Sequence, residues 1–263
     1  MNNRIKDIIN NSGAILLDLD GTVYLDDQLI GDVKNTFDYF RKKGVKLVYL
    51  TNNSSKTDDE YILKLKNLGI FDKRDGFYSS LDGAVDYIKR FYPGKSVYPL
   101  STEKVRDYIE KAGIEVRDNA DVALLTFDLE LTYEKIVKFN NLLVKGAVYI
   151  STHPDYVCPT KDIPVPDAGS FIELFKTSSG RTPDLIIGKP NKPMAEMLVK
   201  NLKLSPKEII MVGDRLYTDV AFGVNNGFNS VLVLSGETTI EDYNKSHIKA
   251  DLVLNSINDL KNL

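Results

Sequence analysis

Cysteine is nearly absent from this chain of 263 residues, which holds a single one, Cys158. One cysteine excludes an internal disulfide framework and fits a reducing compartment. A lone cysteine without a histidine–cysteine signature is more often a small packing residue than a nucleophile, and we interpret Cys158 in that way.

Long apolar runs are also missing. No run approaches the roughly 18 apolar residues that a membrane-spanning helix needs, and the opening Met-Asn-Asn-Arg-Ile-Lys lacks the apolar region of a signal peptide. The sequence therefore predicts a soluble, cytoplasmic protein with no membrane partner.

No charge of one sign dominates the composition. Lys and Arg total 34 against 37 for Asp and Glu, so the formal net charge is −3 and the basic residues are scattered. Proteins that bind nucleic acid carry a basic footprint, and we expect no nucleic-acid partner here. The Walker A pattern Gly-x-x-x-x-Gly-Lys-Ser/Thr is absent too, which argues against nucleotide hydrolysis of that class.

The most informative stretch of the sequence is the run Gly-Ala-Ile-Leu-Leu-Asp-Leu-Asp-Gly-Thr at residues 13–22. Four apolar residues after a glycine are typical of a strand buried on both faces, as in parallel sheets. Alternation along the strand sends Asp18 and Asp20 to the same side. Two carboxylates on one side repel, which favours a bound cation or a shifted pKa. The alternative is an ordinary strand end followed by a solvated turn.

Three later apolar runs also end in polar residues, and the segments between runs show helical spacing. This alternation predicts parallel βαβ units with right-handed crossovers. By itself, a lysine in Gly-Lys-Pro is typical of a surface turn, and paired aspartates before a helix favour its N-terminus through the dipole. The polar residues are Thr51, Asn52 and Asn53 after the first run, Lys189 after the second, and Asp214 with Asp219 after the third.

Together the four motifs resemble those of the haloacid dehalogenase superfamily of phosphatases. The resemblance implies an α/β fold whose core is a doubly wound parallel sheet of the Rossmann type. An inserted module separates the second and third motifs, as the large α/β cap does in the subfamily of 4-nitrophenyl phosphatases and NagD-like phosphatases. We therefore expect a discontinuous catalytic core of residues 1–88 and 183–263 and an inserted α/β cap domain of residues 89–182.

The resemblance also implies roles for the motif residues in a Mg²⁺-dependent phosphatase with a phosphoaspartate intermediate. Asp18 is the expected nucleophile and Asp20 the general acid and base. The expected Mg²⁺ ligands are the Asp18 side chain, the Asp20 backbone carbonyl and Asp214, with Asp219 orienting a water or Lys189. The expected phosphoryl-binding and charge-neutralising residues are Gly21, Thr51, Asn52, Asn53 and Lys189.

Phosphate ester chemistry favours these residue types. A carboxylate nucleophile divides the hydrolysis into two easier steps. A hard cation with oxygen ligands relieves the repulsion between that carboxylate and a dianionic phosphate. A hydroxyl and N–H groups at the start of a helix bind phosphoryl oxygens.

The segment from His153 to Gly169 is rich in proline and turn residues. A loop this long within a compact domain is usually functional or mobile. His153 and Asp155 offer hydrogen bonds to a polar substrate, so we predict both as substrate-binding residues. The alternative is a structural turn after a strand, in which Asp155 bonds its own backbone.

The predicted activity is hydrolysis of small phosphate monoesters such as sugar phosphates or nucleoside monophosphates, with 4-nitrophenyl phosphate as an artificial substrate. A phosphomutase or other phosphotransferase, a phospho-accepting signalling module and a non-catalytic phosphate-binding protein are the alternatives. Asp20 argues against a signalling module, because a general acid–base beside a phosphoaspartate promotes turnover. The expected partner is a small phosphorylated metabolite, and the resemblance leaves a homodimer through the cap open.

Overall fold

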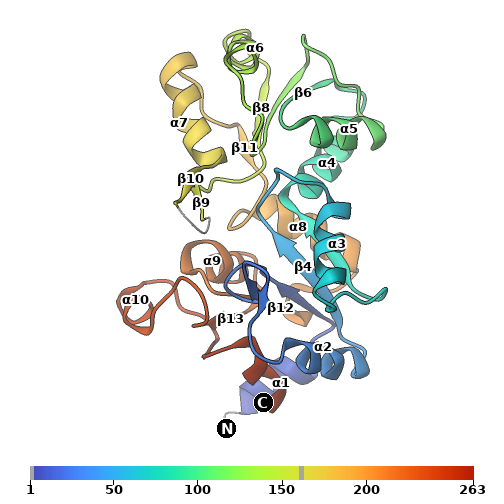
Figure 1. Ribbon diagram of the computed structural model, residues 1–263, viewed down its shortest axis with the longest axis vertical. Helices are drawn as coiled ribbons and strands as arrows, with labels where there is room; N and C mark the ends of the chain where they lie inside the picture. Colours follow the sequence, from blue (N-terminus) through green and yellow to red (C-terminus); the bar gives the residue numbers. More distant parts are fainter. Residues whose placement is uncertain (1–2, 160–162) are drawn as a thin grey trace. The chain divides into compact units, whose positions relative to one another are not determined.

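The computed structural model describes residues 3–159 and 163–263 of the chain (Figure 1). Its residues fall into two compact units. Unit 1 consists of Met1–Thr51, Tyr61–Tyr78 and Lys189–Leu263, and unit 2 of Asn52–Glu60 and Ser79–Gly188.

Unit 1 is built on a six-stranded sheet with the order β14-β13-β12-β1-β4-β5 (Figure 1). The pairs β1–β4, β1–β12, β12–β13 and β13–β14 are all parallel. In the register of the sheet, Leu17 lies beside both Val212 and Tyr49. The carboxyl ends of three central strands therefore coincide, and the residues that follow them share one edge. The strands are β1 (Ala14–Leu17), β4 (Lys46–Thr51), β5 (Gly76–Ser79), β12 (Ile209–Gly213), β13 (Asn229–Val233) and β14 (Leu252–Leu254).

Helices cover both faces of this sheet. On one face, α2 (Val33–Lys42) buries Phe37 and Phe40 in a core cluster with Ile15 and Leu17 of β1. On the other face, α9 (Ala221–Asn225) packs against β12 and β13. This arrangement confirms the doubly wound α/β core that the sequence predicts. The other helical elements of this unit are α1 (Asn3–Asn10), α8 (Lys192–Leu202), η1 (Pro206–Glu208), η2 (Leu216–Val220), α10 (Ile240–Lys245) and η3 (Ile257–Asn262).

A small hairpin follows the first motif. Strands β2 (Tyr24–Leu25) and β3 (Gln28–Leu29) pair in antiparallel fashion. Asp26 in the turn adopts a φ of 53°, a backbone conformation that aspartate tolerates better than most residues. We call residues 24–29 the flap below.

Unit 2 is a second α/β module with a four-stranded parallel sheet in the order β11-β8-β7-β6. Phe139 of α6 packs on Tyr149 of β8 and on Phe175 of α7 in its core. The predicted inserted α/β module is thus present. Its elements are α4 (Ser80–Phe91), β6 (Val97–Leu100), α5 (Glu103–Lys111), β7 (Val122–Leu125), α6 (Tyr133–Val144), β8 (Val148–Ser151), α7 (Ala168–Ser179) and β11 (Leu185–Ile186), while α3 (Asp58–Asn67) begins in unit 2 and continues in unit 1.

The predicted core range of residues 183–263 included residues 185–187, which the structure places in the other unit. Leu185 pairs with Ile150 of β8, so β11 belongs to the sheet of unit 2. A short apolar run does not reveal which sheet it joins, whereas β8, α7 and β11 form one continuous βαβ unit. The compact units also begin and end at residues other than the predicted domain bounds, since unit 2 includes α4 and the segment 52–60.

The predicted long loop from His153 to Gly169 is shorter than expected. It contains an antiparallel hairpin of β9 (Val157–Cys158) and β10 (Val165–Pro166), and α7 begins at Ala168. Strands of two residues are too short to leave an alternating pattern in the sequence. Residues 160–162 of the predicted loop lie outside the described residues.

No helix among the described residues is both long enough and apolar enough to cross a membrane.

Candidate active site

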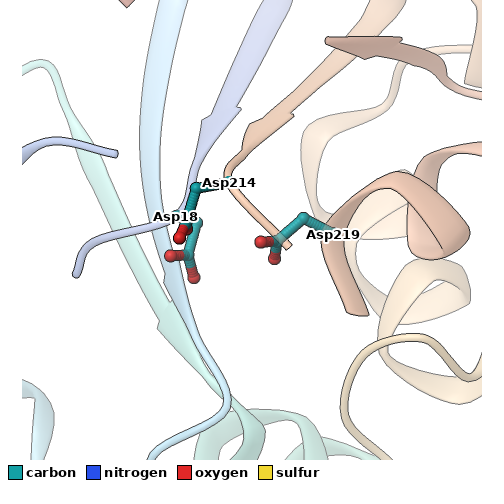
Figure 2. A group of neighbouring side chains, drawn as sticks. All are labelled: Asp18, Asp214 and Asp219. Carbon is teal, nitrogen blue, oxygen red and sulfur yellow. The ribbon is translucent and has the colours of Figure 1, made fainter. Parts of the chain in front are cut away.

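Three carboxylates of unit 1 gather at the shared edge of its sheet (Figure 2). Asp18 follows β1, Asp214 follows β12, and Asp219 lies in the π-helical turn η2. One carboxylate oxygen of each lies within 4.8 Å of the others. Asp214 and Asp219 are buried, and Asp18 is partly exposed. The strand register explains the meeting, because the backbone N–H of Asp18 donates to the carbonyl of Val212 at 3.0 Å.

Lys189 lies among these carboxylates. Its Nζ is 2.6 Å from Asp18 Oδ1 and 2.7 Å from Asp219 Oδ1, and the side chain is only 2% exposed. A lysine buried to this degree is rare unless it is paired. The alternative of a surface turn for Gly-Lys-Pro is therefore not what the structure shows.

The pKa values of the cluster reflect burial first and the excess of negative charge second. Burial, and then the charge of Asp219, raises the pKa of Asp18 well above its ordinary value, with Lys189 opposing. Burial and the charge of Asp219 likewise raise the pKa of Asp214 to about 6. Burial disfavours the charged form of Lys189, but Asp18 and Asp219 outweigh it and raise its pKa. One ammonium does not neutralise three carboxylates, so a divalent cation would relieve the cluster.

Asp214 is enclosed by donors and by glycines. Its Oδ2 accepts from the backbone N–H of Glu237 at 2.7 Å, and its Oδ1 accepts from Thr22 Oγ1 at 3.3 Å. A Cβ at Gly21 would lie 2.5 Å from Asp214 Oδ2, and a Cβ at Gly236 would overlap the same oxygen. The backbone at these two glycines therefore lies directly against the carboxylate, where a side chain would collide with it.

The predicted phosphoryl-binding role of Gly21 stays a prediction, and the structure shows a backbone contact of Gly21 with the flap. Its backbone N–H donates to the carbonyl of Tyr24 in the flap at 2.8 Å, with a φ of 86°. Asp20 is exposed, and its backbone forms an isolated bridge with Tyr24. Burial, and then the charge of Asp20, raises the pKa of Tyr24. Asp20 lies outside the three-carboxylate cluster and belongs to the turn before the flap.

Asp219 lies in the first turn of η2, whose N-cap is Arg215, so the alternative of an acidic residue at a helix start fits its position. Besides Lys189, it accepts from the backbone N–H of Arg215 at 3.1 Å. A Cβ at Gly213 would overlap the Asp219 side chain. The sequence predicted that Asp219 orients a water or Lys189, and its carboxylate bonds Lys189 and lies in the cluster with Asp18 and Asp214.

The remaining predicted residue of unit 1 is Thr51, which closes β4 and is buried.

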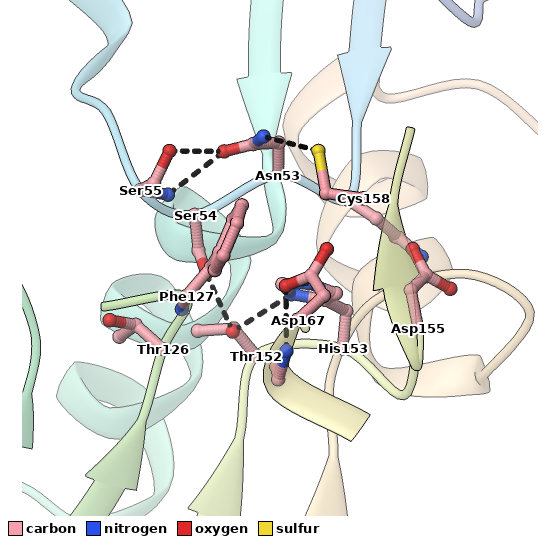
Figure 3. Close-up of polar contacts among 12 residues, drawn as sticks. Asn53, Ser54, Ser55, Thr126, Phe127, Thr152, His153, Asp155, Cys158 and Asp167 are labelled. Carbon is pink, nitrogen blue, oxygen red and sulfur yellow. Dashed lines mark hydrogen bonds and ion pairs between the residues drawn. The ribbon is translucent and has the colours of Figure 1, made fainter. Parts of the chain in front are cut away.

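Four other predicted residues, Asn52, Asn53, His153 and Asp155, lie in unit 2. Figure 3 shows the last three with their neighbours. Asn52 Nδ2 donates to Asp155 Oδ2 at 3.1 Å, so Asp155 does not bond its own backbone as the alternative proposed. Asn53 Oδ1 accepts from the backbone N–H of Ser55 at 2.9 Å and from its hydroxyl at 2.7 Å. Asn53 Nδ2 also lies 4.0 Å from Cys158 Sγ.

His153 is fully buried, and both ring nitrogens have partners within unit 2 (Figure 3). Nδ1 lies 3.0 Å from Thr152 Oγ1, and Nε2 lies 2.9 Å from Asp167 Oδ1. This position favours the structural reading of His153 over the predicted contact with substrate.

Sequence reasoning missed the residues that hold these side chains. Gly236 and Glu237 follow β13 in Ser-Gly-Glu, the same kind of polar strand end as the motifs, so that signal was present. Thr152 directly precedes His153 and Asp167 lies in the predicted loop, but neither position indicated a bond to the histidine.

Comparison with known proteins places the chain in a family. A family model described as haloacid dehalogenase-like hydrolase matches residues 15–115, and a second, HAD-hydrolase-like model matches residues 186–260. An acid sugar phosphatase of Staphylococcus aureus (strain USA300) is 32% identical over 248 residues, covering 94% of this chain and 95% of the relative.

Two solved structures are similar over almost their full length. The 4-nitrophenylphosphatase of Thermotoga maritima has a TM-score of 0.94 and 37% identity, covering 97% of this chain and 98% of the other. A putative nagD protein has a TM-score of 0.87 and 37% identity, covering 92% and 94%. With the four motifs in place and relatives aligned from end to end, the chain belongs to the haloacid dehalogenase-like hydrolases, on their NagD-like branch.

Proposed function

We propose that this protein is a Mg²⁺-dependent phosphatase that hydrolyses small phosphate monoesters through a phosphoaspartate on Asp18. The observation that carries the proposal is Lys189 Nζ, bonded to Asp18 and Asp219 with an oxygen of Asp214 in the same cluster. The names of its relatives, acid sugar phosphatase and 4-nitrophenylphosphatase, support this class of reaction. Sugar phosphates and nucleoside monophosphates are the proposed natural substrates.

The reaction divides between two carboxylates. An oxygen of Asp18 attacks phosphorus, the ester P–O bond breaks, and Asp20 donates a proton to the leaving oxygen. Water then attacks the phosphoaspartate, Asp20 accepts its proton, and phosphate and the Asp18 carboxylate are released. The ammonium of Lys189 offsets negative charge on the nucleophile and the phosphoryl group. Thr51 binds a phosphoryl oxygen, while the binding roles of Asn52, Asn53 and Asp155 stay predictions.

The residues present fit Mg²⁺. The donor set consists only of oxygens, the cluster carries more negative than positive charge, and glycines let the backbone approach Asp214 closely. Asp18, Asp214 and the backbone carbonyl of Asp20 would hold the ion, and the oxygen of Asp219 is near enough to join them. When bound, the ion would screen the phosphate from the nucleophile's charge.

Phosphate release from 4-nitrophenyl phosphate tests the function. We expect turnover with Mg²⁺ and none in Asp18→Asn, because an amide cannot form the acyl phosphate. The exposed Asp59→Asn is the matched control and should keep normal turnover. Near-normal kcat in purified Asp18→Asn would refute the mechanism. Stoichiometric uptake of phosphate without release would instead favour a signalling module or a phosphotransferase.

The acid role of Asp20 has a separate test. Asp20→Asn should lower kcat by roughly 100-fold or more on an alkyl phosphate, whose leaving group needs a proton. The defect should be smaller on 4-nitrophenyl phosphate, whose leaving group is a stable anion. An equal defect on both substrates would count against a general acid at this position.

A further inference from the structure

A continuous chain of hydrogen bonds runs through unit 2 (Figure 3). Ser54 Oγ lies 2.9 Å from Thr152 Oγ1, which lies 3.0 Å from His153 Nδ1. His153 Nε2 in turn lies 2.9 Å from Asp167 Oδ1. All four side chains are buried, with Asp167 the most exposed at 4%. None of the four takes part in the chemistry proposed above.

For a neutral His153 ring, the partners at both ends fix where the hydrogens lie. Asp167 Oδ1 already accepts from the backbone N–H of Ala168 at 2.6 Å, so Nε2 of His153 must donate to this carboxylate. Nδ1 of the neutral ring then accepts from the Thr152 hydroxyl. Thr152 has no second hydrogen to give, so the Ser54 hydroxyl donates to Thr152. Ser54 Oγ itself accepts from the backbone N–H of Phe127 at 2.9 Å, and every group is satisfied.

Thr152 connects the hydrogen-bond chain to two segments of unit 2, each of which adjoins a proposed catalytic residue in the sequence. Through Ser54 it holds the segment that directly follows Thr51 in the sequence. Through its carbonyl it accepts from the backbone N–H of Gly188 at 2.7 Å, and Gly188 directly precedes Lys189.

Gly188 is also confined at this point. A Cβ there would lie 2.8 Å from the Thr152 carbonyl oxygen and 3.1 Å from His153 Cβ. The backbone before Lys189 thus lies directly against the residues that carry the hydrogen-bond chain, and only glycine fits the space.

At the other end of the hydrogen-bond chain, Asp167 is anchored on a helix. Asp167 is the N-cap of α7, and its own backbone N–H donates to the carbonyl of Tyr156 at 3.0 Å. Buried polar groups are costly unless all are bonded, and a fully bonded network fixes one arrangement of its members. An apolar core would fill the same space without fixing the direction of Ser54.

We propose that His153 and Thr152 are positioning residues of this hydrolase, which fix the two segments leading into Thr51 and Lys189. The proposal rests on the proposed function, and it replaces the expected contact of His153 with substrate. His153 orients the Thr152 hydroxyl, Thr152 orients Ser54, and the Thr152 carbonyl holds Gly188.

The first experiment compares Thr152→Val with Thr152→Ser. Valine has the shape of threonine without the hydroxyl, whereas serine keeps the hydroxyl. Thr152→Val should lower kcat by roughly tenfold to 100-fold, because displacing catalytic groups by about 1 Å costs that much. KM should change little, and Thr152→Ser should recover most of the rate. Wild-type kcat in Thr152→Val, or a rise in KM alone, would overturn the proposal.

A second pair of variants tests the two hydrogen bonds of the His153 ring separately. The amide oxygen in His153→Asn can replace Nδ1 as the acceptor from Thr152, whereas the longer His153→Gln can replace only the bond to Asp167. We expect His153→Asn to keep more of kcat than His153→Gln on 4-nitrophenyl phosphate. The reverse order, or a defect confined to KM for a polar substrate, would contradict a positioning role.

Two measurements do not depend on activity. The chain has only two histidines, and His247 is exposed, so it serves as an internal reference in imidazole ¹⁵N NMR of the wild type. His153 should show a protonated Nε2 and an unprotonated Nδ1, and a rapidly averaging ring like that of His247 would overturn the chain. Hydrogen exchange of residues 52–57 should be faster in Thr152→Val and normal in Thr152→Ser. If the wild type released no phosphate, the proposed function would be refuted. Unchanged hydrogen exchange of residues 52–57 in Thr152→Val would separately refute the positioning role.

Discussion

Asp214 shows how strongly a single residue depends on the small residues around it. Gly21 and Gly236 both lie where a Cβ would meet its Oδ2, and the N–H of Glu237 holds that oxygen at 2.7 Å. The position of this carboxylate therefore depends on the missing side chains of two glycines as much as on the hydrogen bond from Glu237.

Gly236→Ala should displace Asp214, because the new Cβ overlaps its oxygen. Disturbing a group that orients a metal ligand typically costs tenfold to 100-fold in metal affinity. We expect the Mg²⁺ concentration for half-maximal rate to rise by about that factor. Gly76→Ala is the control, since its Cβ would meet Val48 at an ordinary 3.4 Å. An unchanged Mg²⁺ requirement in Gly236→Ala would show that Asp214 does not hold the ion.

Lys189 is the second residue whose surroundings predict a measurable effect. Lys189→Met keeps the apolar stem but leaves Asp18 and Asp219 without their shared cation. Removing one partner from a buried ion pair costs about 3–5 kcal/mol. We expect a loss of that size in the free energy of unfolding, measured with urea, together with loss of turnover.

An exposed pair provides the comparison for Lys189. Lys104 pairs with Glu60 at 2.8 Å but is 72% exposed. Lys104→Met should therefore change stability far less than Lys189→Met does. If Lys104→Met and Lys189→Met lowered the free energy of unfolding equally, burial of the Lys189 cluster would not add to its contribution to stability.

Among the elements, the flap is the one whose packing bears on the proposed chemistry. Lys64 of α3 lies 4.1 Å from the centre of the Tyr24 ring, and its Nζ donates to the carbonyl of Asp26 at 2.8 Å. The flap carbonyl of Tyr24 holds the N–H of Gly21, directly after Asp20. A side chain of one helix thus secures the hairpin next to the proposed acid.

Lys64→Met should loosen the flap without unfolding the protein. The lost contacts are partly exposed, so stability should fall by no more than about 1 kcal/mol. Hydrogen exchange over residues 21–29 should become faster, and kcat should fall more on an alkyl phosphate than on 4-nitrophenyl phosphate. Lys66→Met, whose Nζ lies 5.8 Å from the Phe71 ring centre, is the control. Normal hydrogen exchange over residues 21–29 in Lys64→Met would show that Lys64 does not hold the flap in place.

On the scale of the whole molecule, metal binding and folding are linked. A cation that binds only the folded cluster stabilises the fold by about 2.7 kcal/mol at 100 times its dissociation constant. We expect Mg²⁺ to raise the Tm of the EDTA-treated protein, and the rise to be absent in Asp214→Ala. Turnover should vanish with EDTA and return with Mg²⁺, and Ca²⁺ should inhibit because it accepts more ligands at longer distances. Full activity of the metal-free protein would refute the Mg²⁺ requirement.

The sequence by itself determined the α/β class, the parallel core and the acidic strand ends, because strand termini and helical periodicity are local patterns. Asp18, Lys189 and Asp214 could be named from motifs, and the register of β1, β4 and β12 then brings their elements together. The tertiary structure alone decided the rest. Asp219 joins the cluster, and His153 turns inward to Thr152 and Asp167. Those outcomes depend on which residues far apart in the chain become neighbours, and no pattern within either segment encodes that.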